Sequence, residues 1–328
     1  MPSEMPSIQV LCTGILVADI FVPPLPALPA AGELLASDDF LLDTGGCAAN
    51  VATVLARLGL SAAVNGCVGD DVFGDFIVND LQAKGVATSG IVCSEDIGTS
   101  KTVILPVVGE DRRFIHTFGT NAEFHVMDIA IETLKENDVL YLGGFLIMPS
   151  LESYDVAGLF HKARERGITT VLDVVVPGGE GSESMRQLTD ILPYTDYFLP
   201  NDEEAFALTG EADPYRQAMQ FRNAGCGTVL ITRGKHGTLL LNDTTRYEAD
   251  AFPTESVDGS GSGDAFTAGF ITGLVEGWEI AETLRFASAI GASACTKLGC
   301  TTGVFNRAEA EDFLRTHPLQ IIQYSITH

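Results

Sequence analysis

The stretch VDGSGSGDAFTAGF (residues 257–270) places three glycines and two serines in positions 259–263, directly before an apolar helical pattern. A flexible linker is one interpretation, but Gly/Ser linkers normally separate independently patterned regions and lead into polar sequence. Here Asp264 is followed at once by apolar residues at helical spacing, as far as Leu274 and Val275. The pattern therefore indicates a fixed turn at the start of a buried helix.

A turn of this kind is suited to binding an anion. Glycines let successive backbone N–H groups point toward one place, and the first amides and the dipole of the following helix add positive potential there. A phosphate would then lie against Gly261, Ser262 and Gly263. Asp264 has two interpretations, a helix cap or a general base that accepts the proton of a hydroxyl attacking the γ-phosphorus of a bound nucleotide. The stretch fits neither the Walker A pattern nor the dinucleotide-binding pattern.

The composition is that of a globular protein with a sizeable core. Of 328 residues, 46% are hydrophobic, and 44 acidic against 19 basic side chains give a formal charge of -25. This charge opposes binding to nucleic acid or to anionic membrane surfaces, because both need clustered Lys and Arg. An anionic ligand must therefore find a locally positive pocket.

The cysteines and the N-terminal sequence favour a cytoplasmic protein. The seven cysteines are scattered, with no CxxC pair and no histidine at metal-ligand spacing, so we interpret them as reduced thiols, mostly in the core. Residues 1–21 lack a basic n-region, and Gly14 and Asp19 interrupt their apolar stretch. Neither a signal peptide nor a membrane span is predicted.

Short β-branched runs alternate with helical periodicity along most of the chain, which favours βαβ units and a mostly parallel sheet. A helix is predicted at 48–58, and strands are predicted at 8–15, 139–145, 169–175, 196–201 and 228–234. Two segments depart from this alternation and are predicted as extended strands of a small antiparallel flap: 32–43, and 100–120 with a turn at 109–111. Because no long linker or repeat divides the sequence, we expect one domain over 1–328, with lid segments at approximately 20–43 and 99–120.

Two stretches resemble motifs of the PfkB/ribokinase family of carbohydrate kinases. DGSGSGDAF (258–266) resembles the family's DTxGAGDxF element, and GGCAANVATVLARLG (45–59) resembles its N-terminal GG…N motif. Weaker matches keep the family's order at 14–20, 66–74, 201–205, 232–237 and 286–299. The resemblance implies a ribokinase-like three-layer α/β/α sandwich with a mostly parallel central sheet and a small β lid. It also implies ATP-dependent phosphorylation of a hydroxyl, expected to be a primary alcohol, on a sugar or sugar-like acceptor.

The resemblance also implies roles for particular residues. Asp264 would be the base, with 261–263 as the anion hole, and the sugar hydroxyls would be held by Asp19, Gly45, Gly46, Asn50 and Asp264. Taken singly, Asp19 could be a turn residue and Asn50 a polar residue at a helix start. Asn201 and Glu204 would organise hydrated Mg²⁺ beside the nucleotide phosphates, although the same residues fit an N-cap with an acidic first turn.

The remaining matches are expected to surround the nucleotide and a monovalent cation. Thr232, Gly234 and Gly237 would border the phosphates and ribose, or merely connect a strand to a hairpin, and Ser288 and Gly299 would border the adenine, or merely pack in the core. Asp258 and Ser260 occupy positions that bind potassium in several members, but Gly259 replaces the usual Thr between them. After Asp173 the chain continues VVVPGG instead of the frequent N-x-R, which leaves the contacts there open.

The acceptor is less clearly specified. A sugar phosphate or sugar acid calls for clustered Arg or Lys, for which the flap offers Arg112 and Arg113, but an exposed hairpin has the same composition, and a neutral polyol is favoured. His116 and Asn121 could contact hydroxyls or satisfy their own strand and turn. A nucleoside kinase of the same fold and a non-catalytic sugar- or nucleotide-binding regulator are the alternatives. If the outer faces of the lid strands are apolar, two lids are expected to pair in a homodimer.

Overall fold

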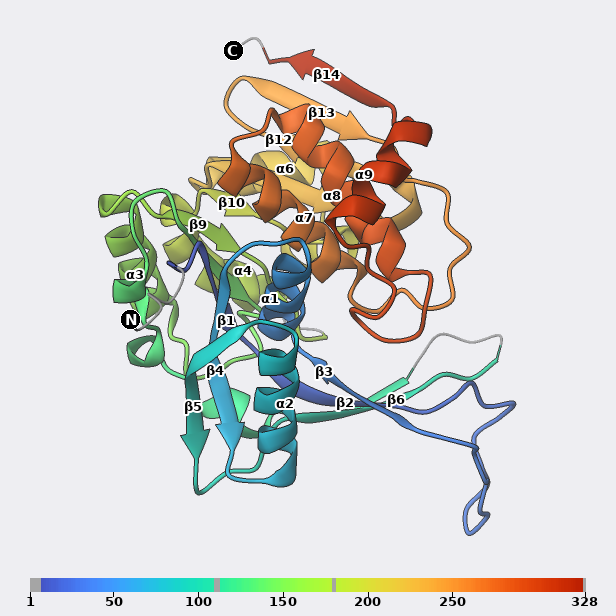
Figure 1. Cartoon of the computed structure of the whole chain (residues 1–328). Helices are drawn as coiled ribbons and strands as arrows, with labels where there is room; N and C mark the ends of the chain where they lie inside the picture. Colours follow the sequence, from blue (N-terminus) through green and yellow to red (C-terminus); the bar gives the residue numbers. More distant parts are fainter. Residues whose placement is uncertain (1–6, 109–112, 179–180, 327–328) are drawn as a thin grey trace, which may run out of the picture.

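The computed structural model describes residues 7–108, 113–178 and 181–326, in which a large sheet lies between two layers of helices and a smaller sheet projects from one end (Figure 1). In these described ranges the large sheet has ten strands, in the order β14 (Ile321–Ser325), β13 (Thr245–Ala249), β12 (Thr238–Leu241), β11 (Thr228–Thr232), β10 (Tyr197–Phe198), β9 (Thr169–Leu172), β8 (Val139–Gly143), β1 (Val10–Gly14), β4 (Ala62–Gly69) and β5 (Ala87–Ser94). The seven strands from β11 to β5 in this order are parallel to one another, whereas β12, β13 and β14 pair antiparallel.

Helices cover both faces of this sheet, and each layer has its own cluster of buried apolar side chains. One layer contains α1 (Cys47–Arg57), α2 (Val72–Ala83), α7 (Ser262–Glu276), α8 (Ile280–Ala294) and α9 (Arg307–Thr316). The other contains α3 (Ser153–Glu165), α4 (Gly181–Ile191), α5 (Asp202–Thr209) and α6 (Pro214–Asn223). The three-layer α/β/α sandwich with a mostly parallel sheet is confirmed, and each of the predicted strand segments contains a strand of this sheet.

The predicted helix at 48–58 is α1, but it is more deeply buried than one apolar face requires. Every residue from Ala48 to Leu55 is buried, because α1 packs between the sheet and α7. Helix α7 is equally buried from Ala265 to Gly273. The polar residues that these two helices carry at their N-terminal ends are therefore held in a rigid frame.

The smaller sheet, which we call the lid, has four strands among the described residues, in the order β3 (Leu41–Gly45), β2 (Val17–Phe21), β6 (Lys101–Leu105) and β7 (Arg113–Thr117). The prediction of an antiparallel flap is wrong in one respect, since β2 and β6 are parallel while the other pairs are antiparallel. Both β2 and β6 leave the body of the protein in the same direction, so their pairing is parallel.

The extended strand predicted at 32–43 is also only partly correct, because β3 begins at Leu41. Its partner β2 ends at Phe21 and is followed by Pro23 and Pro24, which lack the N–H groups that would continue the ladder. Leu34, in the predicted segment but outside β3, is 87% exposed. The turn predicted at 109–111 lies outside the described residues.

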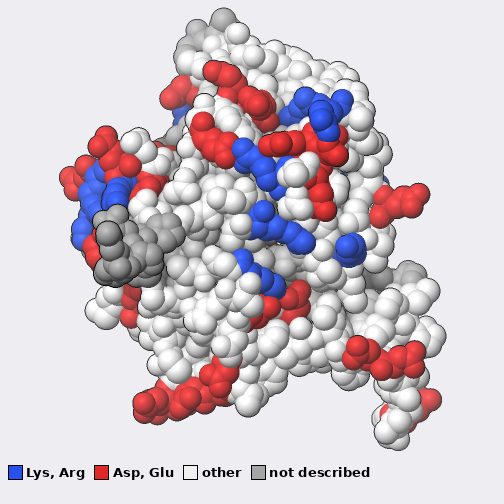
Figure 2. Space-filling model, in the orientation of Figure 1, with Lys and Arg blue, Asp and Glu red and all other residues white. Residues whose placement is uncertain are grey.

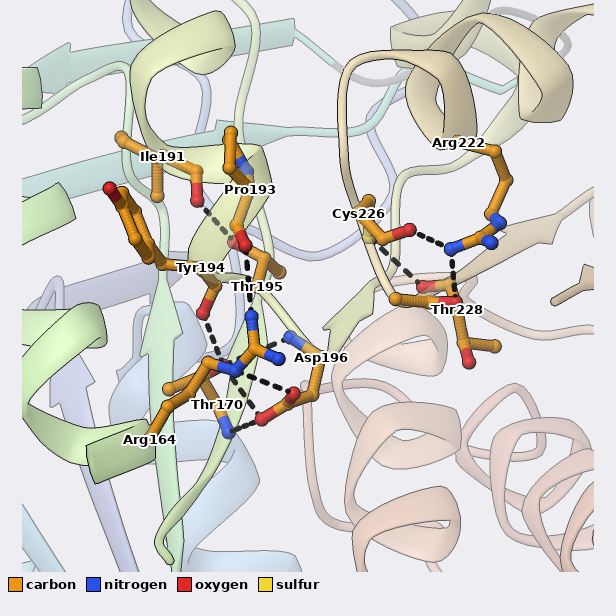
Figure 3. A network of polar contacts seen from close by, with 11 residues as sticks. Arg164, Thr170, Ile191, Pro193, Tyr194, Thr195, Asp196, Arg222, Cys226 and Thr228 are labelled. Carbon is orange, nitrogen blue, oxygen red and sulfur yellow. Dashed lines mark hydrogen bonds and ion pairs between the residues drawn. The ribbon is translucent and has the colours of Figure 1, made fainter. Parts of the chain in front are cut away.

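A polar network fixes the amino-terminal edge of the large sheet (Figure 3). The Asp196 carboxylate accepts hydrogen bonds from the backbone N–H and the hydroxyl of Thr170, at 2.9 and 3.0 Å, and forms an ion pair with Arg164 at 3.3 Å. The residues at this edge line a hollow of about 660 Å³. This hollow lies at the opposite edge of the sheet from the predicted site residues, which follow the carboxyl ends of the strands.

The surface charge and the cysteines agree with the sequence analysis where the structure describes them. On the face drawn in Figure 2, Lys and Arg in the middle and upper parts are interspersed with Asp and Glu, and the lower edge carries further acidic clusters, so this face offers no continuous basic surface. All seven cysteines have free thiols, and Cys93 is exposed. Within the described ranges, no helix combines the length and apolar character needed to cross a membrane.

Candidate active site

Asp264 and Asn50 meet across a sequence separation of 214 residues. Asp264 lies in the first turn of α7, and its Oδ2 accepts a hydrogen bond of 2.7 Å from Asn50 Nδ2 in α1. Burial raises the pKa of Asp264, while hydrogen bonds from Asn50 and Cys47 lower it. The oxygen of the same side-chain amide, Asn50 Oδ1, is buried and has no hydrogen-bond partner in the described part of the chain. The pair therefore presents one carboxylate and one unused acceptor to a ligand.

Asp19 approaches the same place from the lid. It lies in β2, is only 8% exposed, and packs so closely on Gly45 that a Cβ at Gly45 would be 1.8 Å from Asp19 Oδ2. Burial raises the pKa of Asp19 to about 7, and the charges of Asp43 and Asp264 contribute to the rise. Gly46 follows as the N-cap of α1 and accepts the backbone N–H of Asn50. The structure thus brings the predicted sugar-binding residues together with Asp264.

The glycine turn before α7 leaves backbone amides available. Gly261 adopts a φ of 71°, and its missing Cβ would lie 2.3 Å from the Cys300 carbonyl oxygen, so only glycine fits there. The Ser262 N–H and hydroxyl both turn back to the Gly259 carbonyl oxygen, at 3.4 and 2.9 Å. Across the described residues, the N–H groups of Gly263 and Asp264 have no protein acceptor. The available amides therefore extend one residue further into the helix than predicted.

Three carboxylates share the buried floor of this region. Burial raises the pKa of Asp173 well above its ordinary value, and the charges of Glu204 and Asp264 add to that rise. Burial raises the pKa of Glu204 to about 7, again with a contribution from Asp264. The largest influences on these three pKa values are burial, neighbouring carboxylates and hydrogen bonds. A hard divalent cation with oxygen ligands, such as Mg²⁺, would relieve this repulsion, so the donor set fits that ion.

Asn201 and Glu204 form a capping box, which agrees with their alternative interpretation as an N-cap with an acidic first turn. Asn201 Oδ1 accepts the Glu204 N–H, and Glu204 Oε2 accepts the Asn201 N–H, both at 2.9 Å. The box starts α5 and uses only one carboxylate oxygen of Glu204. Capping fixes the orientation of the side chain, and the second oxygen can still face a ligand.

Sequence reasoning did not identify Cys47 and Tyr141 as site residues, and it left the role of Asp173 open. The Tyr141 hydroxyl donates to Asp173 Oδ2 at 2.9 Å, and ligand atoms of Cys47, Asp173 and Asp264 all lie within 4.8 Å of one another. Burial raises the pKa of Cys47 well above its ordinary value, as do the neighbouring carboxylates, so the thiol stays protonated and can donate. Two features of the sequence could have identified these residues. Asp173 stands at the carboxyl end of a predicted strand, and Cys47 stands inside the glycine motif.

The predicted nucleotide-side residues lie on two neighbouring connections. Thr232 ends β11 and pairs with Asn201 through an isolated β-bridge. Gly234 is exposed, whereas Gly237 is buried, and a Cβ there would meet the Ala249 carbonyl oxygen at 1.9 Å. Gly237 is therefore required by the shape of the turn.

The predicted cation residues and one of the two predicted adenine residues, Gly299, meet in a second pair of loops. Asp258 is 6% exposed, and its Oδ1 accepts hydrogen bonds from the Ser260 N–H and hydroxyl, at 3.0 and 2.9 Å. Its Oδ2 accepts the Gly299 N–H at 3.3 Å, which ties the loop before α7 to the loop after α8. Ser288 lies apart from these loops, buried along α8.

Comparison of the sequence with known proteins identifies a family and several relatives. Residues 7–306 match the family described as pfkB family carbohydrate kinase. A ribokinase of Haemophilus influenzae is 26% identical over 299 residues, covering 88% of this chain and 93% of that protein. A 5-dehydro-2-deoxygluconokinase of Clostridium perfringens is 25% identical over 286 residues, covering 83% of each chain.

Comparison of the fold with solved structures agrees. A putative ribokinase II from Escherichia coli, solved in complex with ATP and Mg²⁺, superposes with a TM-score of 0.78 at 22% identity, over 94% of this chain and 100% of the other. Aminoimidazole riboside kinase from Salmonella enterica, solved with aminoimidazole riboside and an ATP analogue, superposes with a TM-score of 0.78 at 22% identity, over 93% of this chain and 99% of the other. At these identities the superpositions establish the ribokinase-like fold.

Proposed function

Because the chain belongs to the pfkB family of carbohydrate kinases, we propose that it transfers the γ-phosphoryl group of ATP to a hydroxyl, expected to be a primary alcohol, of a sugar or sugar-like acceptor. Asp264 is the general base in this proposal, and the amides of the glycine turn form the anion hole. One observation carries it: the Asp264 carboxylate is held by Asn50 at 2.7 Å, next to amides without a protein acceptor.

The geometry suits phosphoryl transfer to an alcohol. Asp19, Asn50 Oδ1 and the backbone of Gly45 and Gly46 hold the hydroxyls of the acceptor, so that the reacting hydroxyl lies against Asp264. Asp264 orients that hydroxyl and accepts its proton late, since the transition state of phosphoryl transfer is loose. The free amides of Gly261, Gly263 and Asp264, with Ser262 holding the turn, receive the negative charge of the transferring group.

ATP and Mg²⁺ are the proposed co-substrate and metal, in line with the related fold solved with both. When bound, Mg²⁺ neutralises charge on the phosphates. Glu204 and Asn201 would hold the Mg²⁺ ion, and we expect them to do so through water molecules. The proposed nucleotide contacts are Thr232, Gly234, Gly237, Ser288 and Gly299.

Potassium is a further proposed ligand, at Asp258 and Ser260, because Asp258 joins the two loops that flank the glycine turn. A cation bound there would hold the turn in place. The expected result is a dependence of turnover on K⁺ that Na⁺ does not reproduce.

We also propose that the chain acts as one unit, with the lid closing over the acceptor, and that two lids pair in a homodimer. The outer face of the lid carries an apolar row across all four strands, formed by Leu42, Ile20, Val103 and Ile115 in register. Leu42 is 37% exposed and Ile115 is 64% exposed. Pairing of two such faces would bury both side chains.

The kinase proposal is tested by acceptor-dependent ADP release across sugars, sugar phosphates, sugar acids and nucleosides, with and without Mg²⁺ and K⁺. Asp264→Asn should lower kcat by at least a hundredfold with little change in acceptor affinity, because proton acceptance is lost while the shape is kept. Asp155→Asn is the matched control, since Asp155 lies in the first turn of α3 and is exposed. No acceptor-dependent ADP, or full activity of Asp264→Asn, would refute the proposal, and activity confined to nucleosides would identify a nucleoside kinase.

A further inference from the structure

We propose that His116 determines acceptor specificity by accepting a hydrogen bond from a hydroxyl at the end of the acceptor remote from the reacting hydroxyl, and so selects neutral polyol-type sugars over sugar acids. This inference rests on the proposed function, because it takes Asp19 as a residue that holds the sugar.

The register of the lid places His116 on the face that Asp19 presents to the site. Side chains of residues paired across neighbouring strands point to the same face of a sheet. One such row crosses all four lid strands, from β3 to β7, and consists of Asp43, Asp19, Thr102 and His116. His116 is therefore the last side chain of the row that begins beside the glycine motif.

Hydrogen bonds along this row fix the tautomer of His116. The Thr102 hydroxyl is 2.9 Å from His116 Nδ1, and Thr102 also hydrogen-bonds to Asp19. A hydroxyl has one proton, and an ionised carboxylate can only accept. Above about pH 7, where Asp19 is ionised, Thr102 therefore donates to Asp19 and accepts from the Nδ1–H of His116, which leaves Nε2 of the neutral ring as an acceptor.

The surroundings of the ring favour a hydroxyl over an anion. Partial burial lowers the pKa of His116, so the ring is neutral at neutral pH. The edge-on contact with the Phe118 ring, at 5.1 Å between centroids, adds no charge. The charged members of the row are Asp19 and Asp43, and Asp43, at the far end of the row from His116, is paired with Lys84 at 3.3 Å. Arg113 occupies a position of β7 whose side chain points to the opposite face. A carboxylate at the His116 end of the acceptor would meet the Nε2 lone pair with no cation among the four residues of the row, whereas a hydroxyl can donate to Nε2.

The order of the row locates the part of the acceptor that His116 contacts. The charge of Asp264 contributes to the raised pKa of Asp19, so the proposed base lies close to that member of the row. His116 is two strands further along the lid, beyond Thr102. An acceptor held by Asp19 with its reacting hydroxyl at Asp264 therefore extends its other end toward the ring.

The test compares kcat/KM for three matched acceptors: an aldose or ketose that the enzyme phosphorylates, its analogue lacking the hydroxyl at the end remote from the phosphorylated carbon, and the corresponding acid with a carboxylate there. The wild-type enzyme should prefer the parent sugar about tenfold over the deoxy analogue, the effect of one hydrogen bond, and more strongly over the acid. His116→Ala should lower the value for the parent sugar about tenfold and leave the deoxy analogue unchanged. His116→Gln, which keeps an acceptor, should recover part of the loss.

Two further variants separate this role from a general effect on the lid. Thr102→Val removes the fixed tautomer and should resemble His116→Ala, whereas Thr102→Ser should resemble the wild type. His161→Ala, at an exposed histidine of α3, should change none of the ratios. Equal losses on parent and deoxy analogue, or a wild-type preference for the acid, would overturn the inference and leave the kinase intact. No acceptor-dependent ADP from any acceptor would overturn both proposals.

Discussion

The hydroxyl of Tyr141, in the middle of the central sheet, donates a 2.9 Å hydrogen bond to the Asp173 carboxylate at the floor of the candidate site. Tyr141 is fully buried and Asp173 is 9% exposed. Burial raises the pKa of Asp173 well above its ordinary value, and the Tyr141 hydrogen bond opposes this rise. A residue of the sheet thus lowers the free-energy cost of burying the Asp173 carboxyl.

Tyr141→Phe should therefore destabilise the protein by about 1–2 kcal/mol, the cost of leaving a buried polar group without its partner. The free energy of unfolding in urea measures this effect. Tyr154→Phe is the control, because Tyr154 is 82% exposed and its substitution should change stability by less than about 0.5 kcal/mol. Equal stability of the two variants would show that the hydrogen bond contributes nothing.

Glu204 predicts a pH dependence of stability. Burial raises the pKa of Glu204 in the folded state to about 7, above its ordinary value of 4.5. A carboxyl with a raised pKa contributes stability that is fully present below its unfolded pKa and is lost as pH rises through its folded pKa. Stability of the ligand-free protein should therefore fall between about pH 4.5 and 7, and Glu204→Gln should flatten this slope.

The melting temperature at several pH values measures the slope. Glu203→Gln is the matched control, because Glu203 is the exposed neighbour in the same helical turn. The interpretation fails if Glu203→Gln flattens the curve as much as Glu204→Gln does.

Much of the site could be predicted because its residues stand in short motifs. The glycine turn, Asp264 and Asn50 are each identified by their immediate neighbours in the sequence. By contrast, the contact between Tyr141 and Asp173 and the row from Asp43 to His116 depend on which strands are neighbours and in what register. Register is set by packing and turn geometry far along the chain, so local pattern did not contain it.

The parallel pairing of β2 with β6 has the same origin. The two strands are separated by more than one helix and strand in sequence, and only the direction in which each leaves the body decides their relative orientation. The early start predicted for β3 was wrong because the prolines after its partner end the ladder, which a strand's own sequence does not reveal.

Asn50 sets the pH profile of the proposed reaction. Its Nδ2 donates to Asp264 and lowers the pKa of that carboxyl against the effect of burial. Asn50→Ala should raise the pKa of Asp264 and move the acidic limb of kcat/KM to higher pH, because a protonated Asp264 cannot accept a proton. A loss of roughly ten- to hundredfold in kcat/KM is expected as well, since Oδ1 is also removed. A uniform loss at every pH, without a shifted limb, would argue against an effect through Asp264.

The apolar row on the outer face of the lid predicts a concentration-dependent dimer. Ile115→Lys places a charge at the β7 end of that row, on its most exposed member, and should convert the dimer to a monomer in light scattering after size exclusion. Tyr154→Lys is the control, because Tyr154 is 82% exposed and lies on α3, in the helical layer on the other face of the large sheet. A wild-type protein that is monomeric at all concentrations would rule out pairing through the lid.

Gly45 and Gly158 differ in what surrounds them, because Gly45 lies against Asp19 whereas Gly158 faces open space. A Cβ at Gly45 would lie 1.8 Å from Asp19 Oδ2, whereas a Cβ at Gly158, exposed in α3, would meet nothing within 4 Å. Gly45→Ala should displace the Asp19 carboxylate and raise the KM for the acceptor more than tenfold, with less effect on the KM for ATP. Gly158→Ala should leave both KM values unchanged and stabilise the protein by about 0.5–1 kcal/mol, since alanine is the better helix former. Steady-state kinetics and urea unfolding of the two variants measure these effects, and an unchanged acceptor KM in Gly45→Ala would remove Asp19 from the acceptor site.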